Sequence, residues 1–158
     1  MAILTEIIEK MHGAWIPDIY REKVRTQRTR SYEMDVPPRE NAAEIFFTLL
    51  GIEMKVGKKR FSCPDLATAR YLLVFARFGC PAVAIPYDIT RISVLADELE
   101  VAWQKLVLVH DDAAGRTSPS AWGRTRAAVV RRIREEIIEA GAGARMPEFR
   151  TSTRQRGD

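Results

Sequence analysis

The clearest pattern of hydrophobic and polar positions in the chain is the alternation over Gly51–Gly57. Side chains two residues apart on a β-strand project from the same face of a sheet. A strand here would bury its isoleucine, methionine and valine against a core, and would project Glu53 and Lys55 together from the opposite face. A carboxylate and an amine placed in this way can bind a divalent metal and put an ammonium beside it. This arrangement is suggestive of phosphodiester chemistry.

Apolar residues at helical spacing predict four helices elsewhere in the chain. These are Ile3–Met11, Leu66–Phe78, Thr90 to about Val101, and Ser120 to about Ala140. Asp65 can cap the second of these helices at its N-terminus, and Gly79 can end it.

Short apolar or alternating runs predict strands between the helices. Besides the strand within Gly51–Gly57, these are Trp15–Tyr20 as an edge strand, Ser31–Val36, Pro81–Tyr87 and Lys105–His110, for which a continuation of the preceding helix is the alternative. Glu33 and Asp35 would share one face of their strand. We expect Arg21–Arg30 to be a hairpin or a mobile loop because it has no apolar stripe, and Lys58–Pro64 to be a polar loop or a short returning strand.

The segment Arg39–Leu50 fits either a helix or a strand. Pro38 before it and Gly51 after it are typical helix boundaries, whereas Ile45–Ile52 is rich in residues that favour strands. We favour the longer helix. Helices and strands together predict a single α/β domain, with a core over residues 1–112. A loop and an arginine-rich helix packed on that core would follow over 113–140, and then a mobile tail over 141–158.

The composition is that of a globular protein, and we expect a cytoplasmic one. The chain has 158 residues, of which 46% are apolar and 29% charged, enough for one domain with a core. No apolar run reaches the roughly 18 residues of a membrane span, and Met1–Lys10 lacks the layout of a signal peptide, so no membrane partner is expected. Two cysteines, Cys63 and Cys80, are too few for a disulfide framework. The absence of glycine-rich phosphate loops disfavours kinases, ATPases and Rossmann dehydrogenases.

The net charge of +4 comes from basic residues grouped in four stretches. Two of these stretches and one helix face supply the residues predicted to bind nucleic acid, which are Arg21, Lys23, Arg25, Arg28, Arg30, Lys58, Lys59, Arg60, Arg70 and Arg77. A third stretch, from Arg116 to Arg134, holds six arginines and no acid, and the fourth lies in the C-terminal tail. Arginine suits bidentate phosphate contacts. A nucleic-acid footprint is therefore predicted, with a solvated basic surface as the alternative.

The run Ile52-Glu53-Met54-Lys55-Val56, followed by a basic loop, a helix and a strand, resembles the PD-(D/E)xK nuclease superfamily. The similarity is to archaeal-type Holliday junction resolvases and restriction-endonuclease-like domains. It implies a small mixed central sheet flanked by helices. It also implies hydrolysis of DNA phosphodiester bonds, with branched or junction DNA as a substrate. DNA is favoured over RNA as the partner, and a homodimer is implied.

The resemblance also implies a site. Its catalytic residues would be Asp35, Glu53 and Lys55. Asp35 and Glu53, with Glu6 or Glu9, would hold Mg²⁺ or Mn²⁺ through oxygen ligands. The metal would polarise the scissile phosphate and lower the pKa of a bound water. Lys55 would orient that water or offset the charge that develops in the transition state.

Two other functions fit the same residues. A non-catalytic nucleic-acid-binding domain would keep the basic faces, need no cofactor and have no converging acids. A structural or assembly protein would use the helix Ser120–Ala140 to contact another chain. Single residues also have plain structural explanations. Glu53 and Lys55 can be an exposed charge pair worth under roughly 1 kcal/mol, and Asp35 can be a turn residue before two prolines.

Overall fold

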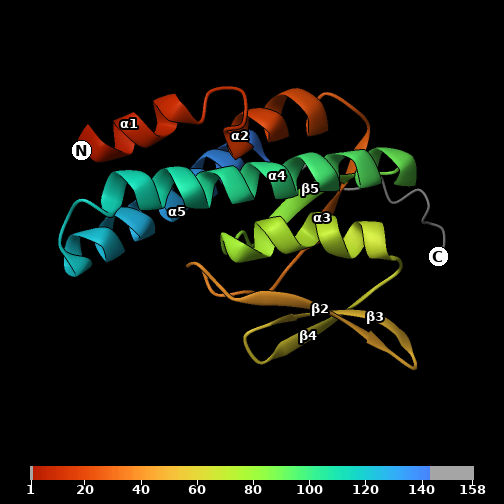
Figure 1. The fold of residues 1–158 in the computed structure, drawn as a ribbon. Helices are drawn as coiled ribbons and strands as arrows, with labels where there is room; N and C mark the ends of the chain where they lie inside the picture. Colours follow the sequence, from red (N-terminus) through yellow and green to blue (C-terminus); the bar gives the residue numbers. More distant parts are fainter. Residues whose placement is uncertain (1, 143–158) are drawn as a thin grey trace.

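The computed structural model describes residues 2–142, and helices and strands follow one another along this part of the chain (Figure 1). In chain order they are α1 (Ala2–Lys10), α2 (Ile16–Ile19), the π-helical turn η1 (Tyr20–Val24), β1 (Thr29–Glu33), β2 (Ala43–Thr48), β3 (Gly51–Val56), β4 (Lys59–Cys63), α3 (Leu66–Arg77), β5 (Ala82–Pro86), α4 (Ile89–Ala114) and α5 (Pro119–Ala140). The protein is therefore a mixed α/β domain, as the sequence predicts. Most of the predicted tail, residues 143–158, lies outside the described residues.

The five strands form two small antiparallel sheets. β2, β3 and β4 are consecutive hairpin strands, in which Met54 lies opposite Ile45 on one side and Phe61 on the other. β1 pairs instead with β5, with Ser31 opposite Ala84. Strands joined by tight turns pair antiparallel, so the backbone hydrogen bonds of β2, β3 and β4 are made among these three strands. Strand β1 pairs with β5 instead. Within residues 2–142 the mixed central sheet implied by the resemblance is not seen.

Helix α3 connects the three-stranded sheet to the rest of the molecule. It packs on the inner face of β2–β4, where Met54 and Val56 are buried, and α4 covers its other side (Figure 1). α1, α2 and α5 pack in turn against α4. The side chain of Asp65 accepts a hydrogen bond of 2.7 Å from the backbone N–H of Thr68, which confirms the predicted cap. The outer face of the three-stranded sheet carries no helix in Figure 1.

Two segments predicted as strands are helical. Trp15–Tyr20 contributes to α2 and η1 because Pro17 sits in the first turn of a helix, where its missing N–H breaks no hydrogen bond. Lys105–His110 continues α4, since Leu106 and His110 extend the buried face of that helix. None of the helices in residues 2–142 is long and apolar enough to cross a membrane.

The ambiguous segment Arg39–Leu50 contains strand β2, so the favoured long helix is wrong. Alternate residues of β2 face the core, and the side chain of Ile45 packs there. The basic segment Arg21–Arg30 is a helical turn followed by the beginning of β1. Within β1 and the residues after it, Met34 and Val36 are buried while Glu33 and Asp35 are exposed, as the alternation predicts.

Candidate nucleic-acid interface

Glu53 and Lys55 project from the outer face of the three-stranded sheet, as the alternation predicts. Glu53 lies opposite Phe46 of β2, and its carboxylate accepts a hydrogen bond of 3.0 Å from Arg60 of β4. The guanidinium of Arg60 also lies 5.5 Å from the centre of the Phe46 ring. The acid is therefore already bound to a neighbouring cation, while Lys55 has no ion pair within residues 2–142.

Asp35 and Glu6, the other predicted metal ligands, lie elsewhere. The 91% exposed side chain of Asp35 pairs with Lys59, which shares the inner side of its sheet with Val56. Glu6 is on α1, far from this sheet in Figure 1, and a hydrogen bond from Lys10 lowers its pKa. No group of three or more histidine, cysteine or acidic residues converges anywhere in residues 2–142. These carboxylates do not fit the Mg²⁺ or Mn²⁺ site that the resemblance implies.

Most of the residues predicted to bind nucleic acid contact acids of the same chain. The pairs are Arg21–Asp18, Lys23–Glu98, Lys59–Asp35, Arg60–Glu53, Arg70–Asp97 and Arg77–Glu100. Arg25 donates to the carbonyl of Ala140, and Arg28 lies over the ring of Tyr87. Arg30 and Lys58 have no ion pair among the described residues. Six of the ten predicted residues are thus paired with an acid of the same chain, and Arg30 and Lys58 are the two without an ion pair, a side-chain hydrogen bond or a cation–π contact in the described chain.

A different set of arginines gathers on one face of α5. Its members, Arg126, Arg131 and Arg134, are five and three residues apart, and all three line the same groove. They form one wall of a groove of about 460 Å³, and a loop before β2 forms the other. The groove is lined by Pro38, Arg39, Glu40, Trp122, Gly123, Arg126, Ala127, Val130, Arg131 and Arg134. Four arginines and one glutamate give it a net of three positive charges. We call it the arginine groove.

Arg126 joins the two walls of the arginine groove. Its Nε and Nη2 atoms donate to the two carboxylate oxygens of Glu40 at 2.9 and 2.8 Å. Its guanidinium also lies within 5.7 Å of the ring centres of Trp103 and Trp122. The Arg126 side chain is only 18% exposed, so this residue is part of the wall. Its bidentate geometry fixes α5 against the loop.

The remaining arginines of the groove are available to a ligand. Arg39 and Arg131 are exposed and have no ion pair within residues 2–142. Arg134 donates one hydrogen bond of 2.9 Å to the carbonyl of Phe78, and a guanidinium has five N–H donors. Three guanidinium groups can therefore still donate to an anion in the groove.

The loop wall is fixed in place by close backbone contacts. The Asn41 side-chain amide donates to the carbonyls of Pro37, Arg39 and Ala76 at 2.9, 3.0 and 3.2 Å. The loop also crosses Gly79, where an added Cβ would lie 2.5 Å from backbone atoms of Arg39 and Pro37. Only glycine permits this approach. The groove is preformed, which lowers the entropy lost when a ligand binds.

Trp122 lies at one end of the groove with 36% of its surface exposed. The buried ring of His110 packs edge-on against it, with ring centres 5.0 Å apart, and holds it in place. The Nδ1 atom of His110 lies 3.0 Å from Asp111, while its buried Nε2 atom has no hydrogen-bond partner among the described residues. An exposed indole held in this way can stack on a nucleobase.

The sequence predictions missed Arg39, Trp122, Arg131 and Arg134 as binding residues. The six arginines from Arg116 to Arg134 were a visible signal, since five of them fall within the predicted helix Ser120–Ala140. The other wall is formed by residues more than 80 positions earlier, and only the tertiary fold brings it there.

A scan against protein-family models found no matching family, and searches of curated proteins and of solved structures found no match either. The function of the arginine groove is therefore interpreted from its own geometry and charge.

Proposed function

We propose that the protein binds nucleic acid, with the phosphate backbone held in the arginine groove between α5 and the loop at Pro38–Glu40. The observation that supports this most directly is that Arg39 and Arg131 face one preformed groove with no internal ion pair in the described chain. Guanidinium groups in such a groove bind phosphates with an affinity that depends on salt and little on base sequence.

The position of Trp122 favours single-stranded or branched DNA over continuous duplex. Stacking on an indole needs a base that has left its own stack, and unpaired bases at a fork or in a single strand meet that requirement. The groove volume of about 460 Å³ is typical of a pocket for one small ligand. A short stretch of one nucleic-acid strand fits it better than a whole duplex. DNA remains the favoured partner.

Hydrolysis of DNA at Glu53 and Lys55, on a restriction-endonuclease-like framework, is the second candidate. Their shared sheet face favours it. The placement of β3 and β5 in different sheets does not fit the single central sheet of that framework. Two further observations disfavour hydrolysis. Glu53 accepts a hydrogen bond from Arg60, and Asp35 pairs with Lys59 away from Glu53.

One experiment tests both candidates. Labelled single-stranded, branched and duplex DNA, and single-stranded RNA, are titrated with the protein in Mg²⁺ or in EDTA, and binding and cleavage are followed together. We expect tightest binding to single-stranded and branched DNA, unchanged by EDTA, with the DNA intact. Arg131→Ala should weaken binding about tenfold, the effect of losing one charged hydrogen bond. Arg124→Ala is the matched control, an exposed arginine of α5 outside the groove.

Equal effects of Arg131→Ala and Arg124→Ala would contradict the assignment to the groove, and an absence of binding would contradict nucleic acid as the ligand. Metal-dependent cleavage lost in both Glu53→Ala and Lys55→Ala would establish hydrolysis instead.

A further inference from the structure

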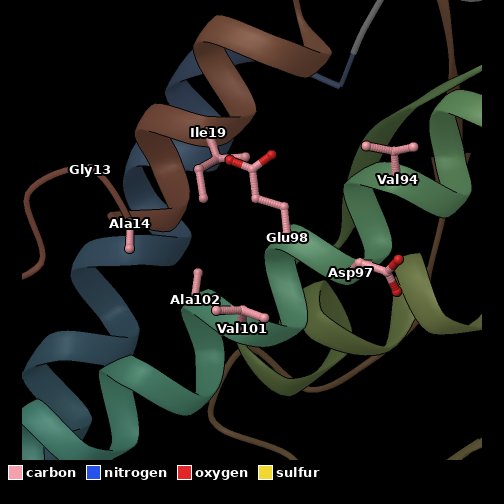
Figure 2. A pocket seen from close by; sticks show the side chains of 8 residues that line it. All are labelled: Gly13, Ala14, Ile19, Val94, Asp97, Glu98, Val101 and Ala102. Carbon is pink, nitrogen blue, oxygen red and sulfur yellow. The ribbon is translucent and has the colours of Figure 1, made fainter.

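Helix α4 carries an apolar stripe that faces solvent in the described structure. Val94, Val101 and Leu108 are 60, 65 and 72% exposed. They are seven residues apart, close to two helical turns, so they lie on one line along the helix. Two of them, Val94 and Val101, also border a groove of about 440 Å³ between α4 and the chain around Ala14 and Ile19 (Figure 2). An exposed stripe with this spacing is typical of a helix that pairs with another helix.

Four charged residues follow the stripe at the same spacing, and their signs alternate along α4. They are Arg91, Glu98, Lys105 and Asp112. Glu98 reaches from α4 toward Ile19 across the groove in Figure 2. Arg91 and Lys105 have no ion pair within residues 2–142. Glu98 and Asp112 do contact Lys23 and Arg116 of their own chain, but a carboxylate can accept from more than one donor.

The alternation of signs selects the orientation of a second copy. If two α4 helices pair antiparallel about a two-fold axis at Val101, Arg91 lies within one residue of the level of Asp112 of the second copy. Glu98 likewise lies within one residue of the level of Lys105. All four contacts across the seam then join opposite charges. In a parallel pair the two-fold axis would place these residues and their copies on opposite sides of the seam, so none of the four contacts would form. Charges beside an apolar seam set the partner and orientation of paired helices in this way.

We propose that this face of α4 is the interface of a homodimer with two antiparallel α4 helices. Val101 packs against Val101 of the second copy, and Val94 packs against Leu108. The groove in Figure 2 lies beside this seam and receives the flank of the second helix. The same surface patch of the two copies forms both sides of the interface, as in a closed two-fold dimer. None of these residues lines the arginine groove, so the inference does not depend on the proposed function.

Cysteine cross-linking tests the antiparallel register. Val101→Cys sits on the proposed two-fold axis, so mild oxidation should give a disulfide-linked dimer of twice 18.0 kDa. Val94→Cys should not link to itself, but should link when mixed with Leu108→Cys. The native Cys63 and Cys80 are buried and should not compete. Leu49→Cys, on a fully exposed turn between β2 and β3, is the control for disulfides that form by random collision.

A sedimentation experiment on the full chain tests the surface without cysteines. The unmodified protein should be a dimer, Val101→Glu a folded monomer, and Leu49→Glu still a dimer. Glu98→Lys and Lys105→Glu should each weaken the dimer, and the double variant should restore it because the contacts are re-formed with reversed signs. A destabilised fold would not be rescued in this way, and the unfolding midpoint of each variant is measured alongside.

Several results would overturn the proposal. They are a monomeric unmodified protein, a dimer that survives Val101→Glu but not Leu49→Glu, self-linking of Val94→Cys as fast as that of Val101→Cys, and a double charge variant weaker than either single one.

Discussion

Replacing Gly79 by alanine should destabilise the protein through the loop that forms one wall of the arginine groove. Gly79 has a φ of +75°, and a Cβ there would lie 2.5 Å from the backbone N and O of Arg39 and the carbonyl oxygen of Pro37. These are backbone atoms, so no flexible side chain can move aside. The loop has to shift, and its hydrogen bonds to Asn41 would be strained.

The cost of Gly79→Ala has two parts. Placing an alanine at positive φ costs roughly 1–2 kcal/mol. Forcing a methyl group into a packed contact costs about 1–3 kcal/mol more. We therefore expect the free energy of unfolding to fall by about 2–5 kcal/mol. Gly57 provides the matched control, because its φ is +60° and nothing lies within 4 Å of an added Cβ. Gly57→Ala should have only the cost of placing an alanine at positive φ.

Urea unfolding of both variants measures the difference. The Gly79→Ala midpoint should lie clearly below that of Gly57→Ala, at a similar slope. Gly79→Ala should also weaken DNA binding, since Arg39 moves with the loop, whereas Gly57→Ala should leave it unchanged. Equal midpoints for the two variants would refute the close approach of the loop to Gly79.

Two further predictions concern the partly buried Glu136 and the two buried cysteines. Burial raises the pKa of Glu136, but hydrogen bonds from Trp15 and two arginines lower it more, so its pKa lies below the usual 4.5. Its stabilisation is therefore complete above pH 4.5 and is lost as the pH falls through the folded pKa. Glu136→Gln should cost about 1–3 kcal/mol in unfolding experiments at neutral pH and progressively less in acid, and a cost independent of pH would contradict this. Burial raises the pKa of Cys80 to about 12 and that of Cys63 above its usual value, so iodoacetamide should alkylate neither thiol before unfolding. Alkylation of the native protein as fast as a free thiol would show that these side chains are accessible.

The elements that the sequence predicts correctly are those with local signals. Asp65 and Gly79 bound α3 because a capping side chain and a positive φ act within one turn of the helix. The stretch Gly51–Gly57 alternates over its whole length, and β3 covers Gly51–Val56 of it. The secondary structure of such a segment can be predicted from its own residues, because the pattern and the residues that bound it act locally.

The incorrect predictions concern segments whose structure depends on distant partners. Within Arg39–Leu50, the strand β2 (Ala43–Thr48) forms because β3 lies beside it, and Asn41 ties the residues before it to α3. The apolar run Lys105–His110 fits either periodicity, and only the packing of Leu106 and His110 against the core selects a helix. The pairing of β1 with β5 joins residues 49 to 57 positions apart, which no local pattern reveals.

The candidate site shows the same limit. Counting arginines identifies the basic stretches, but it does not show which cations already face an acid. Arg70 and Arg77 look as available in the sequence as Arg131, yet the first two pair with Asp97 and Glu100 of α4. Which cations remain free to bind a ligand is decided only in the folded chain. For this reason the proposed interface lies at α5 and not in the N-terminal half.

The salt dependence of DNA binding tests the central claim most directly. The logarithm of the binding constant for single-stranded DNA is plotted against the logarithm of salt concentration for two double variants. Removing two phosphate contacts with Arg39→Ala and Arg131→Ala should reduce the slope by about 1.4, at roughly 0.7 per contact. Arg124→Ala with Lys58→Ala removes the same charge outside the groove and should leave the slope nearly unchanged. Equal slopes for the two double variants would contradict phosphate binding in the arginine groove.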